Sequence, residues 1–237
     1  MLDRPTYLAS LERDAAAFVA LLREAELDAA VPACPGWQVA DLAGHLGGVH
    51  RWARDAVLTG SPGDEPTGPR ERGDLVAWFS DGAALLLDTL TTTDPDTECW
   101  TFGPRPRTVS FWVRRQPHET AMHLRDLRRA LGVQASLDPA FAADGVDEVV
   151  TVFFPRQVRL GRTPPLTAGV RLVATDVGAS WVLAGDGTDA EAAYDATVSG
   201  AAEDLLLWLW RRTGGASLAT AGDVSAVDAA RAMALTP

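Results

Sequence analysis

Residues 112–131 read WVRRQPHETAMHLRDLRRAL, and this stretch decides how the rest of the chain is interpreted. It contains two of the four histidines, His118 and His123, and Glu119 stands four residues before His123. Residues four apart lie on one face of a helix, so Glu119 and His123 project together if the stretch is helical. Pro117 is expected to kink this helix or to mark its true start, because proline lacks an amide donor.

A helical wheel of this segment separates the two histidines. The side chains that mark its inward stripe are Val109, Val113, Thr120, Leu127 and Leu131. His123 falls about 40° and Glu119 about 80° to one side of Val109, with Trp112 between them. His118 points the opposite way and is expected to face solvent. Glu119 and His123 are therefore either half of a metal site or a boundary pair at the edge of the core.

A metal site needs a third protein ligand, and the remaining histidines are His45 and His50. Both lie on a second predicted helix, about 70° from the centre of its apolar stripe and on opposite sides of it. Periodicity alone does not choose between them. One histidine from this helix with Glu119 and His123 would give three ligands and an open position, as in catalytic zinc sites, although nickel, cobalt or ferrous iron would also suit these ligands.

Helical periodicity and loop signals divide the first half of the chain into four predicted helices, which suggest an antiparallel bundle. The predicted helices span residues 6–26, 39–58, 74–90 and 110–131. Stretches rich in Gly, Pro or charge separate them at 29–37, 60–73 and 91–107. The first of these stretches holds Cys34, which is interpreted as a buried thiol because no basic residue stands beside it to lower its pKa.

The second half of the chain predicts an α+β domain. Residues 133–145 are interpreted as a linker, followed by a helix over 146–154 that Pro155 stops. Alternating apolar residues predict a hairpin of 170–174 and 181–185 around a turn at 176–179, and a third strand at 192–198. Ser199 is expected to cap a helix over 200–212. A short strand at 217–219 and a helix over 224–235 complete the domain.

Composition excludes several classes of function. The 237 residues carry a net charge of -11 and 47% hydrophobic residues, which argues against nucleic-acid or membrane binding and suits one large or two modest domains. The chain has no Lys, Asn or Ile, which indicates a GC-rich genome and rules out a lysine Schiff base or a P-loop lysine. Residues 1–24 indicate a soluble helix rather than a signal peptide, so both cysteines are expected to be free thiols in the cytoplasm.

Motifs spread over nearly the whole chain resemble the mycothiol-dependent maleylpyruvate isomerase family of actinobacteria. In the first half they are Cys34-Pro35-Gly36-Trp37, Asp41-Leu42, His45-Leu46-Gly47, Trp100-Thr101-Phe102-Gly103, Arg114-Arg115, residues 118–123 and Asp126. In the second half they are Val198-Ser199-Gly200, residues 204–210 and Gly222-Asp223. The resemblance implies a DinB-like four-helix bundle over residues 1–135, followed by a smaller, sterol-carrier-like α+β domain over 145–237.

The resemblance also implies a site and an activity. It selects His45 over His50, so that His45, Glu119 and His123 would bind a divalent metal, normally zinc. Mycothiol would be the thiol cosubstrate, and its addition to an electrophilic small molecule would lead to isomerisation or to S-transfer. An arginine near the end of the 200–212 helix contributes to the site in the family's isomerases, which implies Arg212 as a substrate-binding residue.

The competing hypothesis is a non-catalytic stress-response protein that keeps the bundle and binds a metal or an apolar ligand. Either protein would be a cytoplasmic monomer or homodimer with neither nucleic acid nor membrane as partner. Metal-dependent consumption of thiol would favour the enzyme.

Overall fold

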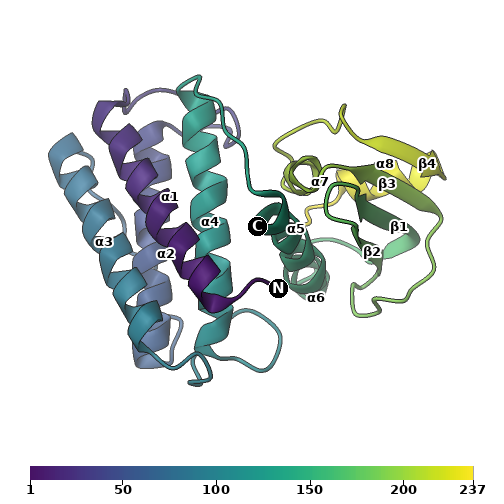
Figure 1. Ribbon diagram of the computed structural model, residues 1–237, viewed down its shortest axis with the longest axis horizontal. Coiled ribbons are helices and arrows are strands. Elements are labelled where there is room, and N and C mark those ends of the chain that lie inside the picture. The colour runs from purple at the N-terminus through teal and green to yellow at the C-terminus, as the bar shows by residue number, and fades with distance from the viewer. Residues whose placement is uncertain (237) are drawn as a thin grey trace. The chain divides into compact units, whose positions relative to one another are not determined.

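Four long helices, joined by loops, form the first half of the chain (Figure 1). The computed structural model describes residues 1–236, in which Leu2–Ser136 form one compact unit and the residues from Leu137 onward form a second. The helices of the first unit are α1 (Arg4–Glu24), α2 (Val39–Thr59), α3 (Arg72–Thr92) and α4 (Val109–Ala130). Helix α1 packs against α3 and α4, and α2 packs against the same two helices, so the four form a bundle. These helices agree with the four that the sequence predicts.

The bundle core follows from the apolar stripes of the helices. Phe18 of α1 and Phe79 of α3 are fully buried and their rings stack with centroids 4.5 Å apart. Helix α4 begins at Val109 and runs through Pro117, so the proline does not mark its start. Because α4 packs against both α1 and α2, tertiary contacts compensate for the one backbone hydrogen bond that Pro117 cannot make.

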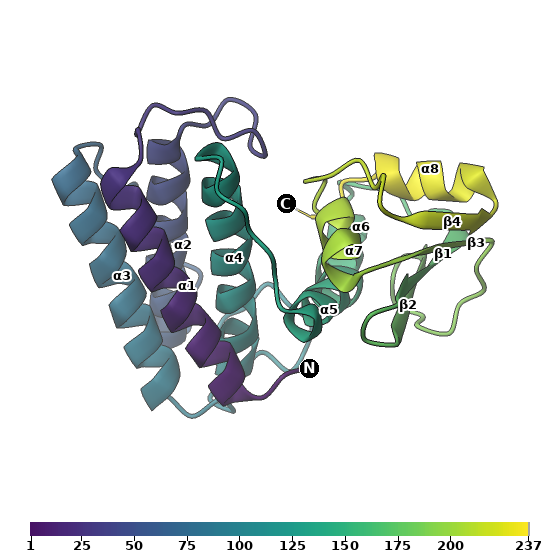
Figure 2. The same ribbon diagram turned by 45° about the horizontal axis from the view of Figure 1, so that its top comes forward.

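The second unit combines helices with a four-stranded mixed sheet, which confirms the predicted helical bundle followed by a smaller α+β domain. Its helical segments are α5 (Pro139–Glu148), the π-helical turn η1 (Val149–Phe153), α6 (Phe154–Arg159), α7 (Ala202–Leu209) and α8 (Val224–Ala232). The strands are β1 (Leu166–Ala174), β2 (Ala179–Gly185), β3 (Ala196–Gly200) and β4 (Ala219–Gly222), in the order β2-β1-β3-β4. Strands β1 and β3 are parallel and the other pairs are antiparallel. Helix α8 lies against β1 and β3 (Figure 2).

Two predictions for the start of this unit are wrong. Residues 133–145 are not a linker throughout, because α5 begins at Pro139, with Asp138 as its N-cap accepting a hydrogen bond from the amide of Phe141 at 3.0 Å. The helix is also not stopped by Pro155, which lies in the first turn of α6 directly after η1. The wider π-helical turn makes room for a ring that would otherwise clash with the carbonyl four residues before it.

The start of α7 also differs from the prediction that Ser199 caps it. Ser199 lies within β3, where it pairs with Val173 and Ala219. The amide of Ala202, at the start of α7, instead donates to Asp176 at 3.0 Å. Asp176 belongs to the turn of the β1–β2 hairpin, so a residue distant in sequence accepts a hydrogen bond that Ser199 was expected to accept.

Among residues 1–236, no helix has both the length and the apolar character that a membrane crossing requires. Neither Cys34 nor Cys99 takes part in a disulfide within this described part of the chain.

Candidate metal centre

Three of the residues predicted to bind a metal come together inside the helical unit. His45 lies on α2, and Glu119 and His123 lie one turn apart on α4. Glu119 Oε1 is 3.1 Å from His123 Nε2 and 3.5 Å from His45 Nε2, and one potential ligand atom from each residue lies within 4.8 Å of the other two. The side chains that the sequence places on two separate helices therefore converge on one point.

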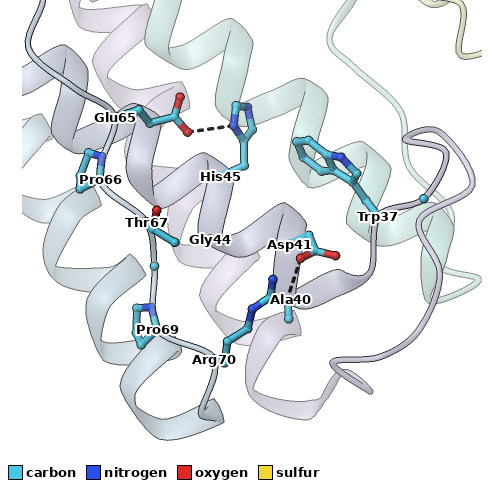
Figure 3. Close-up of a pocket in the computed structure, with 12 residues that line it drawn as sticks. Trp37, Ala40, Asp41, Gly44, His45, Glu65, Pro66, Thr67, Pro69 and Arg70 are labelled. Carbon is cyan, nitrogen blue, oxygen red and sulfur yellow. Dashed lines mark hydrogen bonds and ion pairs between the residues drawn. The ribbon is translucent and has the colours of Figure 1, made fainter.

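In both histidines the other ring nitrogen, Nδ1, is hydrogen-bonded to a carboxylate. His123 Nδ1 lies 3.2 Å from Asp126 Oδ2, and His45 Nδ1 lies 3.0 Å from Glu65 Oε1 (Figure 3). When Nδ1 carries the proton of this hydrogen bond, Nε2, which faces Glu119, is the nitrogen of each ring that is available to bind a metal. Histidines that bind metals in proteins are held in this way by a partner on the other nitrogen.

Glu119 is oriented by its own helix. Arg115, one turn earlier on α4, donates to Glu119 Oε2, so Oε1 is the oxygen that faces the two histidines. The Arg115 side chain is 3% exposed and that of Glu119 is 12% exposed, so this ion pair is shielded from water. A buried charge is tolerated when it is paired in this way.

The pKa values of the three residues reflect their proximity. Burial by itself lowers the pKa of His45, but hydrogen bonds to Glu119 and Glu65 outweigh it and raise the pKa to about 9. Burial likewise opposes protonation of His123, yet the charge of Glu119 and the bond to Asp126 raise its pKa. For Glu119, burial favours the neutral form, but Arg115 and His123 hold the pKa well below its usual range. Without a metal, protons on the histidines thus balance the carboxylate, and a divalent cation would replace them.

This arrangement fits a divalent metal. Tetrahedral zinc with ligands at about 2.1 Å places neighbouring ligand atoms about 3.4 Å apart. Glu119 Oε1 lies at 3.1 and 3.5 Å from the two Nε2 atoms, close to that separation. Two imidazoles and one carboxylate are also a usual donor set for zinc and other first-row metals.

The other two histidines lie outside this cluster. His50 is fully buried and its Nε2 lies 2.9 Å from Thr120 Oγ1, so it contacts α4 beside the cluster without joining it. The prediction that His118 faces solvent is wrong, because the residue is 6% exposed and its ring meets the ring of Tyr7 edge-on, with centroids 6.1 Å apart. The helical wheel assumes that α4 buries one stripe only. In the structure α1 also packs against α4, so the face that carries His118 is buried as well.

Several residues around the cluster were not predicted. The sequence predicted no separate role for Arg115 or Asp126, although their spacing of four and three residues from Glu119 and His123 indicates contact on a helix. Cys34 Sγ lies 3.8 Å from Asp126 Oδ2, so Cys34, His123 and Asp126 form a second group able to hold a metal. Glu65 lies in a predicted exposed loop, and no pattern in the sequence connects it to His45.

A cavity of about 420 Å³ opens beside His45, between the start of α2 and the connection to α3 (Figure 3). Trp37 forms one wall, and its ring centroid is 5.1 Å from that of His45. Farther along, Arg70 and Asp41 form an ion pair at 2.7 Å. The volume lies in the range of small-molecule sites, and His45 connects this space to the cluster.

Arg212, the predicted substrate-binding residue, belongs to the second unit and follows α7. Its guanidinium donates to the carbonyl oxygen of Trp210 at 3.1 Å and lies 5.6 Å from the centroid of the Trp210 ring. Its part in a site with the three helical residues stays a prediction.

Comparison with known proteins identifies relatives for both units. The family model described as the mycothiol maleylpyruvate isomerase N-terminal domain matches residues 8–128, and the MDMPI C-terminal domain matches residues 140–229. No curated protein sequence matches the chain significantly.

Two solved structures share the fold. A crystal structure of the mycothiol-dependent maleylpyruvate isomerase is 15% identical with a TM-score of 0.64, and that of a histidine-to-alanine mutant is 14% identical with a TM-score of 0.65. Each alignment covers 94% of this chain and 95% of the other. At these identities the likeness concerns the fold alone.

Proposed function

Because this chain belongs to the mycothiol-dependent maleylpyruvate isomerase family, we propose that it is a divalent-metal enzyme that uses mycothiol to attack an electrophilic small molecule. The observation that carries the proposal is the convergence of His45 Nε2, His123 Nε2 and Glu119 Oε1, with each of the three side chains held by a separate partner. A boundary pair on one helix, the alternative from the sequence, would need neither a third residue from α2 nor these partners.

The residues of the cluster would hold the metal, with zinc as the expected ion. When bound, a divalent metal would supply a Lewis acid that lowers the pKa of a thiol and makes thiolate available at neutral pH. Asp126 and Glu65 keep a proton on the Nδ1 atoms of His123 and His45, and Arg115 keeps Glu119 ionised. The helical unit thus provides the binding groups already oriented.

The chemistry that follows is addition of the thiolate to an electrophilic carbon of the substrate. In the isomerase case, the thiolate forms a C–S bond at a cis double bond, the resulting single bond rotates, and elimination breaks the C–S bond and returns the thiolate. In the S-transferase case the C–S bond persists: an adduct at a double bond takes up a proton, and an alkylating electrophile instead loses its leaving group with the electron pair of the broken bond. Arg212 would hold a substrate carboxylate by two parallel hydrogen bonds.

Metal analysis tests the site. We expect about one zinc per chain in the wild type, and loss of most of it in His45→Ala and in His123→Ala, since two remaining ligands bind zinc poorly. His118→Ala is the matched control, a histidine on α4 outside the cluster, and should retain the metal. Equal metal content in all four proteins would refute the metal site.

Thiol consumption tests the activity. The metal-loaded protein should consume mycothiol, or catalyse its reversible addition, with at least one member of a panel of cis-unsaturated keto acids and alkylating electrophiles. Chelation should abolish turnover and zinc should restore it. A protein that binds metal yet turns over no substrate in this panel would favour the non-catalytic alternative.

A further inference from the structure

Glu65 is the one of the three partners named above that does not lie on the helix α4. Asp126 and Arg115 lie on α4, next to the residues that they contact, whereas Glu65 lies in the connection between α2 and α3. Its side chain is 42% exposed, yet Glu65 Oε1 lies 3.0 Å from His45 Nδ1. An exposed ion pair contributes little free energy by itself. The contact therefore depends on how the backbone of the connection places Glu65.

Two glycines, Gly48 on α2 and Gly68 on the connection, allow the two segments to approach this closely. A β-carbon at Gly48 would lie 2.6 Å from the carbonyl oxygen of Pro66 and 3.0 Å from Cγ of Glu65. A β-carbon at Gly68 would lie 3.0 Å from Cα of Gly44. The connection therefore lies against α2 at Glu65 and Pro66, and again at Gly68.

The same connection is fixed by two further contacts. A β-carbon at Gly68 would also lie 2.9 Å from the ring of Trp78, and the Arg51 guanidinium lies 4.0 Å from the centroid of that ring. Beyond it, Arg70 pairs with Asp41 in the first turn of α2 (Figure 3). Glu65 is thus presented to His45 from a backbone held on α2 and α3.

We infer that Glu65 is a positioning residue, which acts on the metal through His45. By accepting the Nδ1 proton it selects the tautomer with a free Nε2 and sets the ring so that Nε2 points toward Glu119. Gly48 contributes to the same positioning, because its lack of a side chain allows the connection to bring Glu65 close to His45. The inference rests on the metal site of the proposed function.

The first test compares two nearly isosteric variants, Glu65→Gln and Glu65→Met. Gln still offers an oxygen to the Nδ1 proton, whereas Met offers none. We expect zinc affinity, measured by competition with a chelator, to fall by about 10- to 100-fold in Glu65→Met, the usual cost of losing such a partner. Glu65→Gln should stay within about fivefold of the wild type because the hydrogen bond persists.

A spectroscopic readout separates positioning from general damage. In the zinc-loaded wild type the Nδ1 proton of His45 should give a hydrogen-bonded resonance shifted downfield. That resonance should persist in Glu65→Gln and be lost to exchange with water in Glu65→Met. Both variants should match the wild type in thermal unfolding without metal, since an exposed side chain contributes little to stability.

The second test displaces the connection and leaves Glu65 in place. Gly48→Ala should weaken zinc binding by a similar factor, because its β-carbon would push Pro66 and Glu65 outward. Gly44→Ala is the matched control on the same helix, since a β-carbon there meets no atom within 4 Å. The double variant Gly48→Ala/Glu65→Met should be no weaker than the weaker single variant, because both changes remove one interaction.

The outcomes are distinct. If the wild type binds zinc and Glu65→Met binds it equally well, Glu65 has no positioning role and the metal site stands. Full additivity of the two losses would also contradict the inference, because Gly48 would then act independently of Glu65. If the wild type binds no zinc, both the proposed function and this inference fail.

Discussion

At the scale of single residues, His50 is the histidine whose protonation the fold opposes. Burial lowers its pKa from 6.5 to about 3, and its Nε2 is engaged with Thr120. The unfolded chain therefore binds a proton between about pH 6.5 and 3 that the folded chain does not. Stability must fall as the pH falls through this window, since protons favour the state that binds more of them.

We expect this to appear as a difference between the wild type and His50→Gln, which cannot titrate but can still bond to Thr120. Below pH 6.5 the free energy of unfolding of the wild type should decrease relative to the variant by up to about 1.4 kcal/mol per pH unit. Urea unfolding from pH 7.5 to 4.5, in the presence of a chelator, measures it. Parallel pH profiles would show that His50 is not responsible.

At the scale of elements, the start of α7 is capped by a different residue than the sequence predicts. Asp176 accepts a hydrogen bond from the amide of Ala202, whereas the predicted cap, Ser199, lies in β3. Asp176→Ala should destabilise the chain by about 1 kcal/mol, the usual cost of removing a side chain that accepts from the first amides of a helix. Ser199→Ala should cost clearly less, because Ser199 lies within β3. Chemical unfolding of the two variants beside the wild type measures the difference, and a larger loss in Ser199→Ala would mean that Ser199 is the cap after all.

Prediction from the sequence succeeds for features that lie within one segment and fails for contacts between separate segments. Periodicity identified the four long helices and the β1–β2 hairpin because each carries its pattern within its own residues. It placed Glu119 and His123 on one flank of α4 for the same reason. It misjudged His118 because burial on that face depends on α1, and it had no access to Glu65 or Asp176, whose partners are set by the packing of separate segments.

The choice between His45 and His50 lies at the limit of that reasoning. The two residues are equivalent on the wheel of α2, and the motif around His45 selected it. In the structure both contact α4, but His45 meets Glu119 and Glu65 whereas His50 meets the hydroxyl of Thr120. Carboxylates rather than helix geometry distinguish a candidate metal ligand from a core histidine here.

At the scale of the whole molecule, every residue of the candidate metal centre belongs to the unit that ends at Ser136. His45, Glu119 and His123 lie on helices of one bundle, and so do Arg115 and Asp126, while Glu65 lies on the connection between two of them. A fragment of residues 1–136 has its own core, centred on Phe18 and Phe79. A domain with its own core is able to fold alone.

We therefore expect residues 1–136 to fold and to bind zinc with an affinity within about threefold of the full chain, because the ligands and their partners are all present. Circular dichroism and chelator competition measure the two properties. The fragment should not catalyse thiol addition to a carboxylate-bearing substrate if Arg212, in the second unit, binds that carboxylate. Full turnover by the fragment would show that Arg212 is not needed to bind the substrate. An unfolded fragment would show that the bundle depends on the second unit.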